Sequence, residues 1–219
     1  MIKAIIFDLD GVITDTAEYH YLAWKALATE VGIDFDETFN ENLKGVSRME
    51  SLELILKHGN RQDDFTKQEK VTLATKKNEQ YKTLIKRITP GHYLPGIKEL
   101  LMEIKEAGYK IGVASASFNA PTIIDRLAAN NYIDYIVDPG SVDHGKPAPD
   151  LFLNVADHFS VRAESCIGIE DAKAGIEAIN RAGMFSVGVG TGTAIKEADL
   201  IVQSTSELSL ERLLLAAGS

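Results

Sequence analysis

The amino-acid sequence predicts an α/β protein: a doubly wound parallel sheet with helices on both faces, interrupted near its start by an α-helical domain. Two observations carry this prediction. From residue 97 onward, short apolar runs alternate with helical patterns, which is typical of βαβ units. In contrast, residues 34–89 show helical periodicity, with many lysines and glutamates and no strong strand pattern.

The first strand is expected at residues 2–9, a mostly apolar run interrupted by Lys3 and Asp8. Such a run is typical of a strand that is buried on both faces of a parallel sheet. A helix is expected at 18–31, and Gly32 provides its C-terminal stop. The helical spacing of that segment is carried by Tyr21, Leu22, Trp24, Leu27 and Ala28.

The helical insertion is expected to end at Pro90, because proline interrupts regular structure. We therefore predict two domains. Residues 1–15 and 91–219 form a discontinuous α/β core domain, and residues 16–90 form a helical cap domain. A hinge is expected near Asp15 and Pro90.

After residue 96, helices and strands alternate to the end of the α/β pattern, and glycines close several of the helices. In sheets of this kind, ligands bind beyond the carboxyl ends of the strands. Helices are expected at about 97–107, 121–129, 150–158, 172–182 and 208–216, and strands at 110–115, 133–137, 166–170, 186–189 and 200–202.

Charge and composition narrow the class of function. The 219 residues carry a net charge of −9, which argues against nucleic acid or an anionic membrane as a partner. A phosphorylated ligand would therefore need a local group of cations. Cys166 is the only cysteine, so no disulfide can form within the chain. The sequence also shows no signal-peptide core and no membrane-spanning run. A cytoplasmic location is therefore expected.

Polar residues follow several of the predicted strands, and the carboxyl ends of parallel strands lie at one edge of the sheet. This strand-end rule places the polar residues close together. Four carboxylates at one edge would repel one another unless a cation lay among them, and hard oxygen ligands suit Mg²⁺. The sequence therefore predicts a magnesium site. The residues at this edge are Asp8, Asp10, Ser115, Ser117, Lys146, Glu170 and Asp171.

Asp8 and Asp10 are predicted to divide the chemistry between them. An ionised aspartate can attack phosphorus and form an acyl phosphate, so Asp8 is the expected nucleophile. Asp10 is expected to donate and remove protons as a general acid and base. Lys146 and the Ser115 hydroxyl would offset charge on the transferring phosphoryl group.

These residues resemble the four motifs of the phosphotransferases of the haloacid dehalogenase superfamily. The motifs are Asp8-Leu9-Asp10-Gly11-Val12, Ser115, Lys146 and Glu170-Asp171. The resemblance implies a Rossmann-like core with an inserted helical cap and a phosphorylated Asp8. It also implies a Mg²⁺ ion bound by Asp8, the Asp10 carbonyl and Asp171, with Glu170 nearby.

Three further stretches, residues 14–20, 43–48 and 115–119, are similar to the sugar-phosphate mutases of this superfamily. That resemblance implies interconversion of β-D-glucose 1-phosphate and D-glucose 6-phosphate through a phospho-aspartate and a bound β-glucose 1,6-bisphosphate. Ser117 and Asn119 would hold the distal phosphate, which is the phosphate group that is not being transferred. The residues it assigns to substrate binding are Thr16, His20, Trp24, Lys44, Gly45, Val46, Ser47, Arg48, Ala116, Ser117 and Asn119.

One residue departs from the family pattern. Phe118 stands between Ser117 and Asn119, where the resemblance leads us to expect Lys or Arg. The distal phosphate would then depend more heavily on Arg48, whose guanidinium can bind phosphate through two donors.

Several alternatives stay open. A sugar-phosphate phosphatase of the same superfamily would share every core residue, and a non-catalytic sensor of phosphorylated ligands would need the pocket but no nucleophile. For Trp24, packing is the preferred explanation, and Lys44 and Arg48 could instead belong to an exposed helix face. A mutase must protect its phospho-aspartate from water, which closure of the cap would achieve. Because cap motion needs free space, a monomer is expected.

Overall fold

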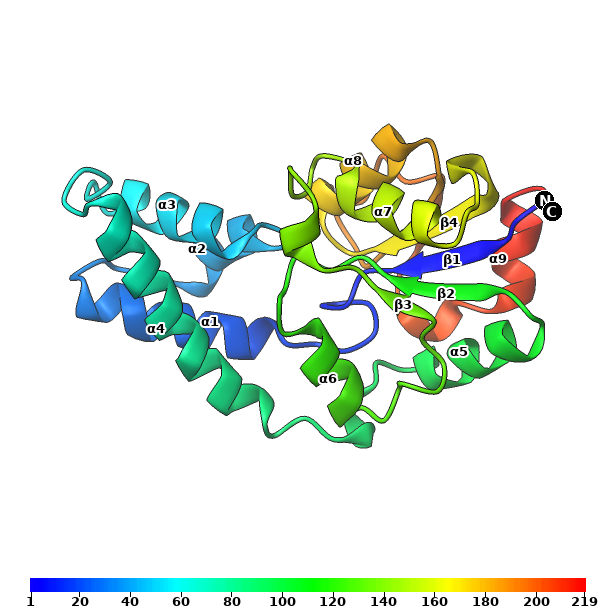
Figure 1. Cartoon of the computed structure of the whole chain (residues 1–219), viewed down its shortest axis with the longest axis horizontal. Coiled ribbons are helices and arrows are strands. Elements are labelled where there is room, and N and C mark those ends of the chain that lie inside the picture. The colour runs from blue at the N-terminus through cyan, green and yellow to red at the C-terminus, as the bar shows by residue number, and fades with distance from the viewer. The chain divides into compact units, whose positions relative to one another are not determined.

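The computed structural model describes all residues, 1–219, and the chain folds into two compact units (Figure 1). Unit 1 comprises Met1–Asp15 and Ile88–Ser219, and unit 2 comprises Thr16–Arg87. The chain passes into unit 2 after Asp15 and returns at Ile88.

Unit 1 is built on a six-stranded parallel sheet in the order β3-β2-β1-β4-β5-β6. The predicted α/β class with a parallel sheet is confirmed, and each predicted strand is present. The first three strands are shorter than predicted, and the last three match the prediction to within one residue. The strands are β1 (Ala4–Phe7), β2 (Lys110–Val113), β3 (Tyr135–Ile136), β4 (Cys166–Glu170), β5 (Phe185–Val189) and β6 (Leu200–Val202).

Helices cover both faces of this sheet, with α7 and α8 on one face and α5 and α9 on the other (Figure 1). Their apolar residues recur three and four positions apart, as a helix that packs on a sheet requires; in α5 these are Ile97, Leu100, Leu101 and Ile104. The helices of unit 1 are α5 (Ile97–Glu106), α6 (Ala120–Arg126), α7 (Asp150–His158), α8 (Lys173–Ala182) and α9 (Leu210–Ala216).

The strand order fixes where a ligand can bind. The chain builds outward from β1 through β2 to β3 and then crosses back to place β4 on the other side of β1. A crevice forms at such a switch point, beyond the carboxyl ends of the two neighbouring strands. The register pairs Phe7 with both Val113 and Ile169, so Asp8 leaves the sheet level with Glu170.

Unit 2 is entirely helical, as predicted for the insertion. Its helices are α1 (Ala17–Glu30), α2 (Glu37–Asn40), α3 (Arg48–His58) and α4 (Lys67–Ile85). Capping boxes begin α3 and α4: Ser47 pairs with Glu50, and Thr66 pairs with Glu69. Leu22, which the helical pattern placed with the apolar face of α1, is instead 39% exposed, because the buried face of that helix is narrower than the pattern.

Single 3-10 turns join several of these elements: η1 (Glu41–Leu43), η2 (Pro90–His92), η3 (Pro139–Ser141), η4 (Ala163–Ser165) and η5 (Thr205–Glu207). No helix combines the length and the apolar character that crossing a membrane demands. Cys166 lies buried in β4.

Candidate active site

Asp8 lies at the centre of a cluster of charged side chains at the carboxyl ends of the strands. This strand-end cluster comprises Asp8, Lys146, Glu170 and Asp171. Asp8 follows β1 directly, and its backbone N–H donates to the carbonyl of Ile169 on β4 at 2.9 Å. The residue is only 6% exposed. The aligned register of β1 and β4 places the Glu170 carboxylate beside it, and neighbouring strands lie about 4.8 Å apart. Two carboxylates are therefore forced together in a buried place.

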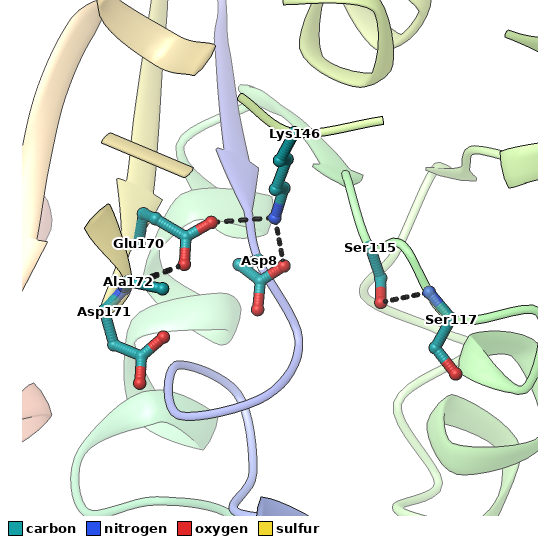
Figure 2. Close-up of polar contacts among 7 residues, drawn as sticks. All are labelled: Asp8, Ser115, Ser117, Lys146, Glu170, Asp171 and Ala172. Atoms are coloured by element: carbon teal, nitrogen blue, oxygen red, sulfur yellow. Dashed lines mark hydrogen bonds and ion pairs between the residues drawn. The ribbon is translucent and has the colours of Figure 1, made fainter. Parts of the chain in front are cut away.

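Lys146 separates these two carboxylates. Its side chain is fully buried, and its ammonium group donates to Asp8 Oδ1 and, at 2.7 Å, to Glu170 Oε2 (Figure 2). It reaches the sheet edge from the loop that precedes α7. The predicted local cation is present, and it forms ion pairs with both carboxylates.

The Glu170 side chain is fixed at its other oxygen as well. Its Oε1 accepts hydrogen bonds from the backbone N–H groups of Asp171 at 3.0 Å and of Ala172 at 3.1 Å (Figure 2). Glu170 is fully buried. The segment that leads into α8 therefore wraps around this carboxylate and holds it against Lys146.

Burial and mutual charge shift the pKa values of this cluster. Burial, and next the charge of Glu170, raise the pKa of Asp8 to about 7, although the Lys146 charge acts in the opposite direction. Burial likewise raises the pKa of Glu170 above its ordinary value. Burial opposes the charge on Lys146, but Asp8 and Glu170 outweigh it and raise its pKa. Lys146 is therefore charged, and Asp8 gains or loses its proton near neutral pH.

The acidic residues of this cluster fit a small hard cation. One carboxylate oxygen from each of Asp8, Glu170 and Asp171 lies within 4.8 Å of the others, and Mg²⁺ takes oxygen ligands of this kind. Asp10 follows Asp8 by two residues, and its backbone N–H donates to the Asp8 carboxylate. Gly11 has a φ of +78°, and a Cβ atom there would lie 2.1 Å from Asp171 Oδ2.

The end of β2 contributes a run of hydroxyl groups. Ser115 is buried, and its Oγ accepts from the backbone N–H of Ser117 at 3.1 Å (Figure 2). Ser117 Oγ in turn accepts from the N–H of Asn119 at 3.2 Å. Ala116 packs against the hydrophobic core, whereas Phe118 is 55% exposed. These bonds fix the backbone of the predicted phosphate loop.

Unit 2 holds another group of the predicted substrate residues around a buried lysine. Lys77 Nζ lies 2.9 Å from His20 Nδ1 and 4.5 Å from the centre of the Trp24 ring. Tyr81 O–H donates to Thr16 Oγ1 at 3.2 Å. Burial, and next the charges of Lys77 and Arg48, hold the pKa of His20 well below its usual range. His20 is therefore neutral, and Trp24 belongs to the core of unit 2.

The remaining predicted substrate residues form the turn that leads into α3. Lys44 Nζ pairs with Glu41 Oε2 at 2.8 Å. Gly45 adopts a φ of +72°, a conformation that favours glycine. The Val46 N–H donates to the Leu43 carbonyl at 3.2 Å. Ser47 caps α3, and Arg48 is the first residue of that helix.

Lys77 is only 3% exposed and is not among the residues predicted for the site. A signal for it exists in the pattern. Lys77 follows buried Ala74 by three residues and precedes buried Tyr81 by four, so the spacing places it on the buried face of α4. The many lysines of this helix concealed that position.

Comparison with known proteins identifies relatives of the chain. A model of the haloacid dehalogenase-like hydrolases matches residues 2–183, so the predicted resemblance is confirmed. The chain is 53% identical over 211 residues to β-phosphoglucomutase of Bacillus subtilis, an alignment that covers 96% of this chain and 93% of that protein. It is 27% identical over 206 residues to the phosphorylated carbohydrates phosphatase of Thermotoga maritima, with coverage of 91% and 92%.

A solved structure agrees with these relatives. The crystal structure of β-phosphoglucomutase from Clostridium difficile matches with a TM-score of 0.98 and 51% sequence identity, covering 100% of this chain and 98% of that one. The fold and the strand-end cluster therefore belong to a chain that is similar to phosphomutases over its whole length.

Replacing Lys146 by methionine is expected to lower the free energy of unfolding by about 3–5 kcal/mol, because it leaves two buried carboxylates without their cation. Urea unfolding measures the change. The matched control is Lys173→Ala, which removes an exposed lysine paired with Glu177 at 3.8 Å and is expected to cost less than about 1 kcal/mol. Equal losses for both variants would contradict the assigned role of Lys146.

The raised pKa of Asp8 predicts a pH dependence of the metal-free protein. Between the ordinary aspartate pKa of 3.8 and about 7, the folded state keeps a proton that the unfolded chain releases. Stability therefore falls as pH rises through this window, at most about 1.4 kcal/mol for each pH unit. Asp8→Asn lacks this titration, so its stability relative to the parent should increase from pH 5 to pH 8.

Denaturant unfolding of both proteins in the presence of a chelator tests this expectation. A stability difference between Asp8→Asn and the parent that stays constant across the same pH range would show that Asp8 has an ordinary pKa.

Proposed function

The chain belongs to the haloacid dehalogenase-like hydrolase family, and from that premise we propose that it is a phosphomutase that interconverts β-D-glucose 1-phosphate and D-glucose 6-phosphate. The relative at 53% identity is a β-phosphoglucomutase. The single observation that carries the chemistry is the buried Asp8 carboxylate held by Lys146 at the switch point of the sheet. That arrangement suits an aspartate that accepts and returns a phosphoryl group.

The proposed reaction proceeds in two transfers. Phosphorylated Asp8 gives its phosphoryl group to the 6-hydroxyl of β-D-glucose 1-phosphate, and Asp10 removes the proton of that hydroxyl. The β-glucose 1,6-bisphosphate formed then presents its other end. Asp8 attacks the phosphorus of the phosphate group on C1, and the bond between that phosphorus and the sugar oxygen breaks. Asp10 returns its proton to the leaving oxygen. Glucose 6-phosphate and phospho-Asp8 result.

The chain supplies the electrostatic setting for both transfers. Lys146 lies against Asp8, where it can offset charge on phosphoryl oxygens. Ser115 provides a hydroxyl at the neighbouring strand end. We propose Asp8, the Asp10 carbonyl and Asp171, with Glu170 beside them, as the Mg²⁺ site. When bound, Mg²⁺ supplies further positive charge to the transferring phosphoryl group.

The substrate contacts are proposed from the sequence motifs. Ser117 and Asn119 bind the phosphate that is not reacting, and Arg48 compensates for the absence of a cation at Phe118. His20, Lys44 and Arg48 of unit 2 contact the sugar phosphate, and closure of unit 2 excludes water. The sugar phosphate partner, the monomeric state and the cytoplasmic location stay predictions.

A phosphatase acting on sugar phosphates is the second candidate. It would use the same core residues, and the phosphatase relative from Thermotoga maritima shares 27% identity with this chain. The two functions differ in the acceptor of the phosphoryl group, which is a sugar hydroxyl in one and water in the other. The 53% identity to a mutase favours the first.

Incubation with Mg²⁺, β-D-glucose 1-phosphate and a trace of glucose 1,6-bisphosphate tests the proposal. Glucose 6-phosphate is expected to form far faster than free phosphate, because the acceptor is the sugar. Asp8→Asn, which lacks the nucleophile, is expected to abolish both products. Rapid release of free phosphate without a requirement for the bisphosphate would instead identify a phosphatase.

Closure of unit 2 is tested separately by small-angle scattering. Addition of Mg²⁺, glucose 6-phosphate and a phosphoryl mimic such as aluminium fluoride is expected to reduce the radius of gyration, with Mg²⁺ alone as the control. An unchanged radius would refute the proposed closure about Asp15 and Pro90.

A further inference from the structure

Gly175 lies inside α8 and is buried against the active-site cluster. A Cβ atom on Gly175 would lie 1.8 Å from Glu170 Oε2, 2.0 Å from its Cδ and 2.3 Å from its Cγ. Non-bonded atoms do not approach one another this closely, so any side chain at this position requires the Glu170 side chain to move.

Both carboxylate oxygens of Glu170 are held by hydrogen bonds. One oxygen accepts from two backbone N–H groups, those of Asp171 and Ala172, and the other accepts from Lys146. The residue is fully buried, so water cannot replace a lost partner. Moving the carboxylate therefore also releases Lys146, which holds Asp8.

The helix itself gives no reason for a glycine here. Glycine is the poorest helix former apart from proline, and alanine is the best. Gly175 does not have a positive φ, so the backbone conformation there is one that alanine can adopt. Gly11 differs, because its φ of +78° already requires glycine whatever lies nearby. The constraint on Gly175 comes from Glu170.

We propose that Gly175 is a positioning residue of the active site: the absence of a side chain at this point of α8 is what lets Glu170 hold Lys146 against Asp8. The inference rests on the function proposed for Asp8, Lys146 and Glu170. It assigns to Gly175 an effect on metal binding and phosphoryl transfer that is exerted entirely through Glu170.

The test is a double-mutant cycle of Gly175→Ala and Glu170→Ala, measured by thermal unfolding and by Mg²⁺ titration calorimetry without substrate. In the parent, Gly175→Ala is expected to lower the melting temperature and to weaken Mg²⁺ binding about 10-fold or more, the usual effect of displacing a group that supports a metal site. In the Glu170→Ala background, the clashing atoms are gone. The same change should leave Mg²⁺ affinity unaltered and leave the melting temperature equal or higher.

Gly168→Ala is the matched control for steric damage alone. A Cβ atom on Gly168 would lie 2.7 Å from Ile179 Cγ1, which is an apolar core contact and not a contact with a carboxylate. This variant is expected to lower the melting temperature while keeping Mg²⁺ affinity within about 2-fold of the parent.

Three results would overturn the proposal. They are a Gly175→Ala protein with parental Mg²⁺ affinity, an equal loss of stability from Gly175→Ala in both backgrounds, or an equal loss of Mg²⁺ affinity in Gly168→Ala. If Gly175→Ala fails to fold, folding of the double variant supports the proposal and failure of the double variant contradicts it.

These measurements need no sugar phosphate, so failure of the mutase assay would leave them valid. Failure of the proposed function and failure of this inference are therefore distinguishable.

Discussion

The structure depends on a single buried ion group, the Lys146 ammonium held between the carboxylates of Asp8 and Glu170. Parallel pairing of β1 with β4 aligns the two acids at one edge of the sheet, where their repulsion would oppose folding. A cation between them removes that conflict. Because charges buried without partners are costly, Lys146 makes the pairing of the central strands compatible with two adjacent acids.

This constraint also explains how the site is prepared for chemistry. Asp8 must be ionised to attack phosphorus, yet burial and the charge of Glu170 raise its pKa to about 7 even though Lys146 acts in the opposite direction. A metal ion among the same carboxylates would lower this pKa. Glu170 does not need to react. Its two backbone N–H contacts and its contact with Lys146 fix the position of the ammonium group, which in turn fixes that of the nucleophile.

Much of this could be predicted from the sequence, since the signals are local. The apolar runs and helical spacings predicted every strand of the sheet and the helical insertion, and the strand-end rule brought Asp8, Lys146 and Glu170 to one edge. The strand order and register could not be predicted, because they depend on pairing between distant segments. Lys146 was expected to face the phosphoryl group, but its pairing with both acids emerges only from the register of β1 and β4.

Other features could not be predicted from the sequence, because the residues involved differ from the usual pattern of their helices. Lys77 is a buried lysine in a helix rich in exposed ones, and Gly175 acts through the space that it leaves empty. Leu22 satisfied a helical pattern but is partly exposed, because periodicity gives the direction of a face and not its width. Such positions are decided by tertiary packing.

Mass spectrometry can show whether Asp8 carries the phosphoryl group. The protein would be mixed with Mg²⁺ and glucose 1,6-bisphosphate, quenched rapidly in acid, digested and analysed peptide by peptide. We expect the mass of one added phosphoryl group on the peptide that contains Asp8, and none in Asp8→Asn. A phosphoryl group found on another residue, or none at all while glucose 6-phosphate is being formed, would contradict this expectation.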